Sequence, residues 1–248
     1  MKFYYGLQNL ELIHYTPRFL LSYYAFRNLK TIVNNEGKEW QLDSGGFTLG
    51  IKNTLQNPFK YDYNWNIETY ADFINRQQPT IAWTMDAAVK YPYTKDIIAK
   101  KQEITNEKTA KLIDYTHKKI GNILQGWAFE DYIDHIDKMK ESGTLTDWIG
   151  ISVSRAKKNK YFARDLILML SKNLPSRIKL HGLGFKYALL RPFPILRKTL
   201  YSADSANWFT YGQFMYPKDM GTGALLKYIN EMEIFLSNEN QNDIYDYF

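Results

Sequence analysis

The sequence contains no cysteine, and this absence limits its chemistry from the start. Disulfide bonds and zinc sites that use cysteine ligands are excluded. Histidine is also scarce: the four histidines are His14, His117, His135 and His181, and no two of them stand at the spacing of metal ligands. We therefore expect no metal site and no other cofactor.

Long apolar segments are missing as well. No run of residues approaches the roughly 20 apolar residues that cross a bilayer. The start of the chain, Met1 to Gly6, has no apolar core of the kind found in signal peptides. We expect a soluble protein with no membrane partner, located in the cytoplasm. The abundance of Tyr, Lys, Asn and Ile fits an AT-rich genome, viral or otherwise, and a viral protein would lie in the host cytoplasm.

What the chain does contain is enough apolar material for one large core. It has 248 residues, of which 45% are hydrophobic and 16% aromatic, and this length is typical of a single α/β barrel. No internal repeat, low-complexity linker or composition shift marks a second domain. We expect one domain over residues 1–248, with a polar tail at about 238–248 that frays.

The hydrophobic pattern alternates between short apolar runs and amphipathic stretches, which predicts a parallel sheet covered by helices. The expected strands are Phe3–Leu7, Trp40–Asp43, Ile81–Asp86, Gly121–Gln125, Trp148–Val153, Ile178–Leu180 and Leu200–Ala203. The expected helices are Glu68–Gln77, Lys95–Lys118, Phe129–Met139, Tyr161–Leu170 and Gly223–Leu236, and a long loop covers Asn53–Asn66.

Polar residues follow the expected strands at a spacing that suits a barrel. They are Asp43, Asp86, Gln125, Ser152, His181 and Asp204, separated by 23 to 43 residues. Eight units in about 250 residues average about 31 residues each, so we predict a TIM (β/α)8 barrel. An open doubly wound sheet is the alternative, but its Gly-rich phosphate loop is missing after the first strand, where Gly6 stands alone. Barrel enzymes work at the carboxyl ends of their strands, where all these residues would meet.

Three of these residues are carboxylates with catalytic potential. Asp204 follows a strand among small residues and could attack an anomeric carbon, or it could cap a helix. Asp43 precedes Ser44, Gly45 and Gly46 and could move a proton on a leaving base, or it could serve a turn. Asp86 could accept hydrogen bonds from a purine, or it could also be a cap.

The other strand ends offer polar and bare backbone groups. Gln125-Gly126 could present a donor and an acceptor to the same base, or form a polar strand end. The backbone amides at Gly150-Ile151 and from Gly182 to Gly184 could approach a flat ligand, or the glycines could allow tight packing in the barrel mouth. His181 is either a satisfied core histidine or a catalytic one. We expect His117 and His135 to lie within helices, on the surface.

A basic stretch follows the expected strand at Trp148–Val153. It carries five positive charges between Arg155 and Arg164. We expect Arg155, Lys157, Lys158 and Lys160 to bind the phosphates of a nucleic acid, although a solvated helix face is an equal alternative. The net charge of +6 suits a polyanionic partner. Trp127, Trp208 and Tyr211 are expected nearby as exposed rings that could stack on bases.

In combination, these segments resemble the tRNA-guanine transglycosylase superfamily from about Gln41 to Ser205. The most specific piece is Asp43-Ser44-Gly45-Gly46-Phe47, which is similar to the Asp-Ser-Gly-Gly-aromatic motif of that family. The remaining pieces follow in the family's order: Asp86, Gln125-Gly126, Gly150 to Val153, Gly182-Leu183-Gly184 and Asp204.

The resemblance implies a TIM barrel that exchanges a nucleobase. Asp204 would be the nucleophile that takes the sugar carbon, and Asp43 the acid and base near the exchanged base. The groups implied to hold the purine or 7-deazapurine are Ser44, Gly45, Gly46, Phe47, Asp86, Gln125, Gly126, Gly150, Ile151, His181 and Gly182. A free 7-deazaguanine-type base would be the second substrate, and a homodimer is frequent among such proteins.

The chain departs from the tRNA enzymes in two ways. It lacks the C-terminal zinc site of three Cys and one His, and Ala87 or Ala88 replaces a Cys often found beside the base-recognition Asp. The chain looks more like the 7-deazaguanine DNA transglycosylases of the DpdA type. The similarity lies in its compact form and in the sequences Phe3-Tyr4-Tyr5-Gly6, His181 to Gly184 and Ser202 to Ser205. We therefore favour DNA over tRNA. The alternatives are a tRNA-guanine transglycosylase acting on RNA, a non-catalytic nucleic-acid-binding member of the superfamily and a simple glycosidase.

Overall fold

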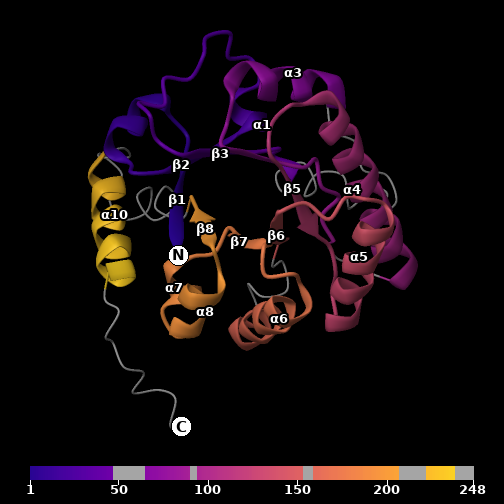
Figure 1. Ribbon diagram of the computed structural model, residues 1–248. Helices are drawn as coiled ribbons and strands as arrows, with labels where there is room; N and C mark the ends of the chain where they lie inside the picture. Colours follow the sequence, from indigo (N-terminus) through magenta and orange to yellow (C-terminus); the bar gives the residue numbers. More distant parts are fainter. Residues whose placement is uncertain (47–64, 90–93, 153–158, 207–221, 238–248) are drawn as a thin grey trace.

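The computed structural model describes residues 1–46, 65–89, 94–152, 159–206 and 222–237. Its strands form one closed barrel, in which each strand pairs in parallel with the next along the chain and β8 pairs with β1 (Figure 1). The strands are β1 (Lys2–Leu7), β2 (Phe19–Ser22), β3 (Trp40–Asp43), β4 (Ile81–Trp83), β5 (Ile120–Leu124), β6 (Trp148–Ser152), β7 (Lys179–Leu183) and β8 (Ser202–Ser205).

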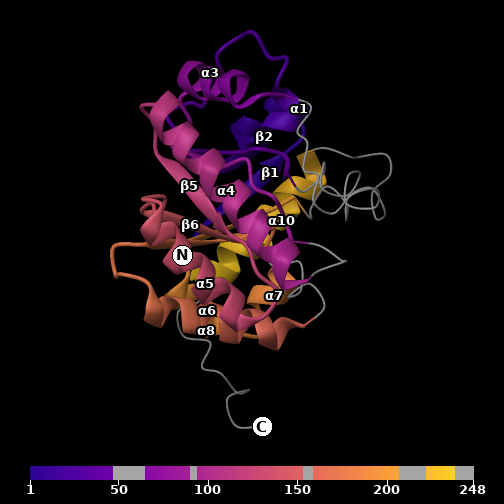
Figure 2. The ribbon, with the colours of Figure 1, turned by 90° about the vertical axis from the view of Figure 1, so that its right-hand side faces the viewer.

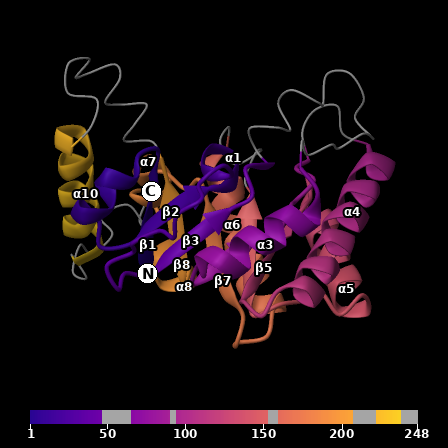
Figure 3. The same cartoon turned by 90° about the horizontal axis from the view of Figure 1, so that it is seen from above.

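Helices surround this ring of strands. Figure 2 shows α3, α4, α5 and α6 following one another down one side of the molecule, and Figure 3 shows the strands between α4 and α5 on one side and α10 on the other. The helical elements are the 3₁₀ helix η1 (Leu10–Tyr15), α1 (Tyr23–Phe26), α3 (Ile67–Gln77), α4 (Lys95–Tyr115), α5 (Phe129–Glu141), α6 (Lys160–Asn173), α7 (Tyr187–Leu190), α8 (Pro194–Thr199) and α10 (Thr222–Ser237).

Side-chain caps begin three of the long helices where the sequence supplies Asn or Thr. The side chain of Asn66 accepts from Thr69 N–H at α3, Thr94 caps α4 and Asn159 caps α6. Such caps satisfy backbone donors that the first helical turn leaves without partners. Because each of these helices starts after a strand has ended, the caps lie toward the carboxyl ends of the strands.

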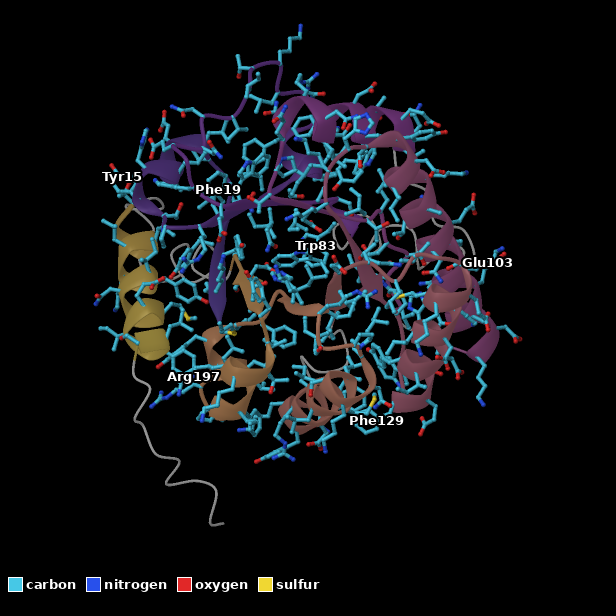
Figure 4. The ribbon with its side chains drawn as sticks, in the orientation of Figure 1. Tyr15, Phe19, Trp83, Glu103, Phe129 and Arg197 are labelled. Atoms are coloured by element: carbon cyan, nitrogen blue, oxygen red, sulfur yellow. The ribbon has the colours of Figure 1, made fainter. Side chains whose placement is uncertain are left out.

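The large ring of Trp83 fills the barrel interior. Figure 4 shows Trp83 in the middle of the ring of strands, and its side chain is fully buried. Neighbouring strands make room for it with glycine: a Cβ added to Gly121 would stand 2.4 Å from the ring, and one added to Gly150 would stand 3.0 Å from it. The ring also stacks on His181, with centroids 4.7 Å apart, so aromatic packing closes the interior beneath this histidine.

Charged and aromatic side chains pack at the opposite, amino-terminal end of the strands. Lys2 pairs with Glu39 at 2.6 Å, and the Lys179 ammonium lies 5.2 Å from the centroid of Trp148 and 4.8 Å from that of Tyr201. The two Lys179 contacts are cation–π interactions with Trp148, which begins β6, and with Tyr201, which precedes β8. The polar groups at the other end of the barrel are thus separated from this end by a packed layer.

The barrel predicted from the sequence is confirmed for the described residues, and most elements lie where they were expected. Sequence reasoning missed β2, which has four residues and is followed by a single helical turn, so neither its length nor its context marks it as a strand. β4 ends at Trp83 rather than Asp86: Thr84 N–H still donates to the Gly121 carbonyl of β5, but Asp86 N–H turns back to the Thr84 carbonyl, and the backbone beyond it bonds to side chains of α4. β7 extends to Leu183, and β8 covers Ser202–Ser205 rather than beginning at Leu200.

Two further expectations change. α4 ends at Tyr115, because Thr116 is extended and both its N–H and its hydroxyl donate to the Leu112 carbonyl, so His117 lies beyond the helix. His135 lies on α5 but is fully buried, not on the surface as expected. The expected loop at Asn53–Asn66 falls mostly, and the tail at 238–248 wholly, outside the described residues. Within the ranges that the structure describes, every helix is too short or too polar to cross a membrane.

Candidate active site

The first carboxylate, Asp43, is the last residue of β3 and sits above a sharp turn. Its Oδ2 accepts a hydrogen bond from Gly45 N–H at 3.0 Å. Gly45 has a φ of +85°, and a Cβ there would stand 2.5 Å from the Cβ of Tyr24. Glycine is therefore required at this position for two independent reasons, conformation and space. The turn fixes the direction of the Asp43 carboxylate at the strand end.

The electrostatics of Asp43 show that three carboxylates share one region. Burial, followed by the charges of Asp86 and Asp204, raises the pKa of Asp43 to about 7, against the lowering effect of the Gly45 and Ser44 amides. Like charges raise a carboxyl pKa only when they lie near one another in a region of restricted solvent. Near neutral pH, Asp43 is therefore divided between its protonated and ionised forms, which suits a group that both gives and takes a proton.

Asp204 lies on β8 and is held by β7. Its Oδ1 lies 3.0 Å from His181 Nε2 and accepts a second hydrogen bond from Gly184 N–H at 3.0 Å. The Asp204 side chain is 11% exposed, so it can still be reached by a substrate. Within the part of the chain that the structure describes, both donors bind the same oxygen, so Oδ2 is the oxygen able to face a substrate.

His181 in turn is fixed by its other ring nitrogen. Nδ1 lies 2.8 Å from Ser202 Oγ, and strand pairing places His181 directly beside Ser202. An ionised carboxylate only accepts, so Nε2 carries the hydrogen toward Asp204 and Nδ1 accepts from the serine hydroxyl. These two contacts give His181, Ser202 and Asp204 hydrogen-bond partners. With its ring stacked on Trp83 and no exposed surface, His181 supports Asp204 and does not face the solvent.

Asp86 and Gln125 form the second polar pair of the site. Gln125 Nε2 donates to Asp86 Oδ2 at 2.8 Å, while Gln125 Oε1 accepts from Val89 N–H at 3.1 Å. Both ends of the amide are thus engaged within the protein. These bonds fix the orientation of the amide, and its second hydrogen and second lone pair would have to serve a base.

Buried polar residues of α4 hold the segment that carries Asp86. Thr105 Oγ1 accepts from Ala87 N–H at 3.0 Å, and Lys101 Nζ donates to the Ala88 carbonyl at 2.7 Å. Lys101 is almost fully buried, and burial lowers its pKa although the charge of Asp86 raises it. A cation beside Asp86 partly offsets the negative charge of the three carboxylates.

A third layer of polar contacts fixes the backbone of Gln125. Its N–H donates to His135 Nδ1 at 2.8 Å, and its carbonyl accepts from Gln102 Nε2 at 2.9 Å. Burial lowers the pKa of His135 to about 3, so this ring is neutral and its Nε2–H points toward Asn106 Oδ1, 3.2 Å away. Gln125 is therefore positioned on both sides by residues of α4 and α5.

The glycines and the apolar member of the predicted site act mainly through packing. An added Cβ would stand 2.8 Å from Tyr132 at Gly126, 2.9 Å from Leu183 at Gly150 and 2.6 Å from Phe185 at Gly182. Ile151 has a fully buried side chain in the main hydrophobic core. Only the backbones of these residues remain able to meet a ligand.

Several predicted binding residues cannot be placed. Phe47, Arg155, Lys157, Lys158, Trp208 and Tyr211 lie outside the described residues. Lys160 is the first residue of α6 and is exposed, whereas Trp127 is half-buried rather than exposed. Ser44 and Gly46 are buried in the turn after Asp43.

Sequence reasoning missed the polar residues of α4 and α5 that support the site. The signal was available: Lys101, Thr105 and Thr109 repeat at four-residue spacing on the face of α4 that should be apolar, and all three are buried. Thr109 Oγ1 donates to Thr84 Oγ1 at 2.9 Å, which extends the support to the end of β4. A polar stripe on a core-facing helix indicates a hydrogen-bonded interior.

The arrangement has three distinct carboxylates within one barrel mouth. Asp43 titrates near neutrality, Asp204 has one oxygen held by two donors, and Asp86 is paired with the side-chain amide of Gln125. Among the described residues no cluster of His, Asp and Glu has the geometry of a metal site. Comparisons with protein-family models and with curated proteins gave no match for this chain.

Proposed function

We propose that this protein is a base-exchange glycosyltransferase that replaces guanine in DNA by a 7-deazaguanine derivative through a covalent Asp204 intermediate. The observation that carries the proposal is the pKa of Asp43, which burial, Asp86 and Asp204 raise to about 7. It supports a single site in which a nucleophile, a proton carrier and a base-recognition carboxylate work together. The order of the motifs along the chain supports the same reaction.

In the first half of the reaction, Asp204 Oδ2 attacks C1′ of the target nucleotide. The C1′–N9 bond breaks, the leaving guanine takes the proton of Asp43, and the sugar becomes an ester of Asp204. Contacts from His181 and Gly184 to Oδ1 hold the carboxylate in one orientation during the attack. The carboxylate also stabilises the positive charge that develops on the sugar.

In the second half, the free 7-deazaguanine base gives its N9 proton to the Asp43 carboxylate. N9 then attacks C1′, the ester bond breaks and Asp204 returns to its starting state. No energy source is needed, because one N-glycosidic bond replaces another. Two displacements at the same carbon retain its configuration.

Asp86 supplies the group that would recognise the base. With Oδ2 bound to Gln125 Nε2, the carboxylate has a fixed orientation from which it can accept hydrogen bonds from the N–H edge of a purine. Lys101, held at the Ala88 carbonyl, keeps a cation near this carboxylate and so favours its ionised form.

The reaction can be tested by trapping the intermediate. The protein is mixed with a guanine-containing oligodeoxynucleotide, with and without a 7-deazaguanine base, and separated on a denaturing gel. We expect an adduct that forms without the free base, disappears when the base is added and is absent in Asp204→Asn. The asparagine variant keeps an acceptor for Gly184 N–H, so loss of the adduct with retained folding points to the nucleophile.

Two outcomes would contradict the proposal in different ways. An adduct with oligoribonucleotides and none with DNA would assign the enzyme to RNA. Nucleic-acid binding without any adduct on either polymer would assign it to the non-catalytic members of the superfamily.

A further inference from the structure

Positive charge is concentrated in one part of the barrel. Residues 159–206 contain nine Lys or Arg and two Asp, whereas the whole chain has a net charge of only +6. One of the two acidic residues is Asp204, which lies in the barrel. The segment forms α6, β7, α7, α8 and β8, and Figure 1 shows α6, α7 and α8 beside one another at the edge of the barrel.

Four of these cations lie on the side where the candidate active site opens. Lys160 and Arg164 are in the first turns of α6, which starts after β6 has ended, and Lys186 and Arg191 flank α7, which starts just after β7. Lys160, Lys186 and Arg191 are exposed, and Arg164 is half-buried. Lys186 follows by two residues Gly184, whose N–H binds Asp204, so this surface continues directly from the site.

The same surface carries an exposed aromatic ring. Tyr161 is 53% exposed, although its ring packs edge-on against Phe193 at 5.4 Å between centroids. Lys160 Nζ and the Arg164 guanidinium lie 5.5 Å and 5.4 Å from the centre of the Tyr161 ring. Arg164 also forms an ion pair with Asp165 at 2.7 Å. Because this pair is partly exposed, it contributes little free energy, and a phosphate can replace Asp165 as the partner of Arg164.

An exposed ring with cations beside it is the arrangement by which proteins bind unpaired nucleic acid. Bases of a single strand stack on the ring, and the cations meet the phosphates on either side. Bases within a duplex are stacked on one another and cannot use the ring. The proposed chemistry also requires the target base to leave its stack, so the strand next to it is locally unpaired.

We infer that Lys160, Tyr161, Arg164, Lys186 and Arg191 form a docking surface for a single-stranded nucleic acid segment beside the target nucleotide, with one base stacked on Tyr161. This inference rests on the proposed function for the identity of the neighbouring site. The surface itself can be tested by binding alone, without any turnover.

The test uses a fluorescent oligonucleotide of about 12 thymidines, a length within the usual site size of single-strand binders. It contains no guanine, so binding reports the surface and not the reaction. Tyr161→Ala should weaken binding about 5- to 150-fold, the range expected for loss of one stacked base. Tyr161→Phe keeps the ring and should bind like the wild type.

The charged residues are tested through the salt dependence of the same measurement. Replacing Lys160, Arg164, Lys186 and Arg191 by Gln should reduce the slope of log affinity against log salt by about 0.7 for each lost phosphate contact. Lys172→Gln with Lys198→Gln is the control: both residues are exposed and lie in the last turns of α6 and α8, away from the site. This control should leave the slope unchanged.

Three results would overturn the inference. They are wild-type affinity in Tyr161→Ala, an equal loss in the Lys172 and Lys198 control, and failure of the wild type to bind either oligothymidine or oligouridine. Comparing those two polymers shows which sugar is preferred, and binding to either supports the surface. Wild-type protein that binds oligothymidine but forms no covalent adduct with guanine-containing DNA would refute the proposed reaction and leave this surface intact.

Discussion

The raised pKa of Asp43 has a consequence for stability that does not depend on catalysis. In the unfolded chain an Asp side chain has a pKa of about 3.9, whereas burial, Asp86 and Asp204 raise that of Asp43 to about 7 in the folded protein. Between these values the folded state holds a proton that the unfolded state has released. The contribution of Asp43 to stability therefore falls as the pH rises through this window, and it is least favourable above pH 7.

Asp43→Asn removes this titration while keeping an oxygen that can accept from Gly45 N–H. A difference of about 3 pKa units corresponds to roughly 4 kcal/mol of folding free energy at pH 8. At pH 5 the same variant gains only about 1–2 kcal/mol, because the wild-type folded state is still protonated there. The advantage of the variant should thus grow by roughly 3 kcal/mol between pH 5 and pH 8 and remain constant above that.

Urea unfolding of both proteins across this pH range measures the difference directly. Asp134→Asn, which removes an exposed carboxylate from α5, is the matched control and should change little with pH. Because only the pH dependence is compared, any constant cost of the substitution cancels. A free-energy difference for Asp43→Asn that stays flat from pH 5 to pH 8 would show that the three carboxylates do not crowd one another, and would refute the reasoning about the site.

Three other predictions use the same geometry. The rate of adduct formation should fall as the pH rises above about 7, since the leaving base needs the proton of Asp43, and a stopped-flow or quench series that rises instead would contradict this role. His181→Gln, which keeps a donor for Asp204, should form adduct faster than His181→Ala by about tenfold or more, whereas equal rates would leave the histidine a packing role only. Gly121→Ala should lower the free energy of unfolding, measured with urea, by about 1–3 kcal/mol, because its Cβ would stand 2.4 Å from the Trp83 ring, and an unchanged free energy would show that the ring moves freely.

The sequence predicts the barrel well because its signals are local. Apolar runs ending in polar residues, such as Leu42 before Asp43 or Ala203 before Asp204, mark the ends of parallel strands without any knowledge of their partners. β2 was missed because three apolar residues and a serine, followed by one helical turn, carry too little pattern to be distinguished from other buried segments.

The contacts within the site were harder to predict from the sequence, since they depend on which strands become neighbours. The bond between His181 and Asp204 follows from the pairing of β7 with β8, and nothing in the spacing of the two residues reveals which ring nitrogen faces the carboxylate. His135 was misplaced for a similar reason: its position on a helix is visible, but the backbone of Gln125 that it accepts from is not.

The position of the Trp83 ring also limits how substrates and products reach and leave the proposed site. Among the described residues, the interior is filled beneath His181 and charged side chains pack at the far end, so the proposed site is approached from the carboxyl ends of the strands. Under the proposed reaction, the displaced guanine must vacate this site before its replacement arrives, so the two bases take turns. Steady-state kinetics should then show parallel double-reciprocal lines, and excess guanine should compete with the incoming base.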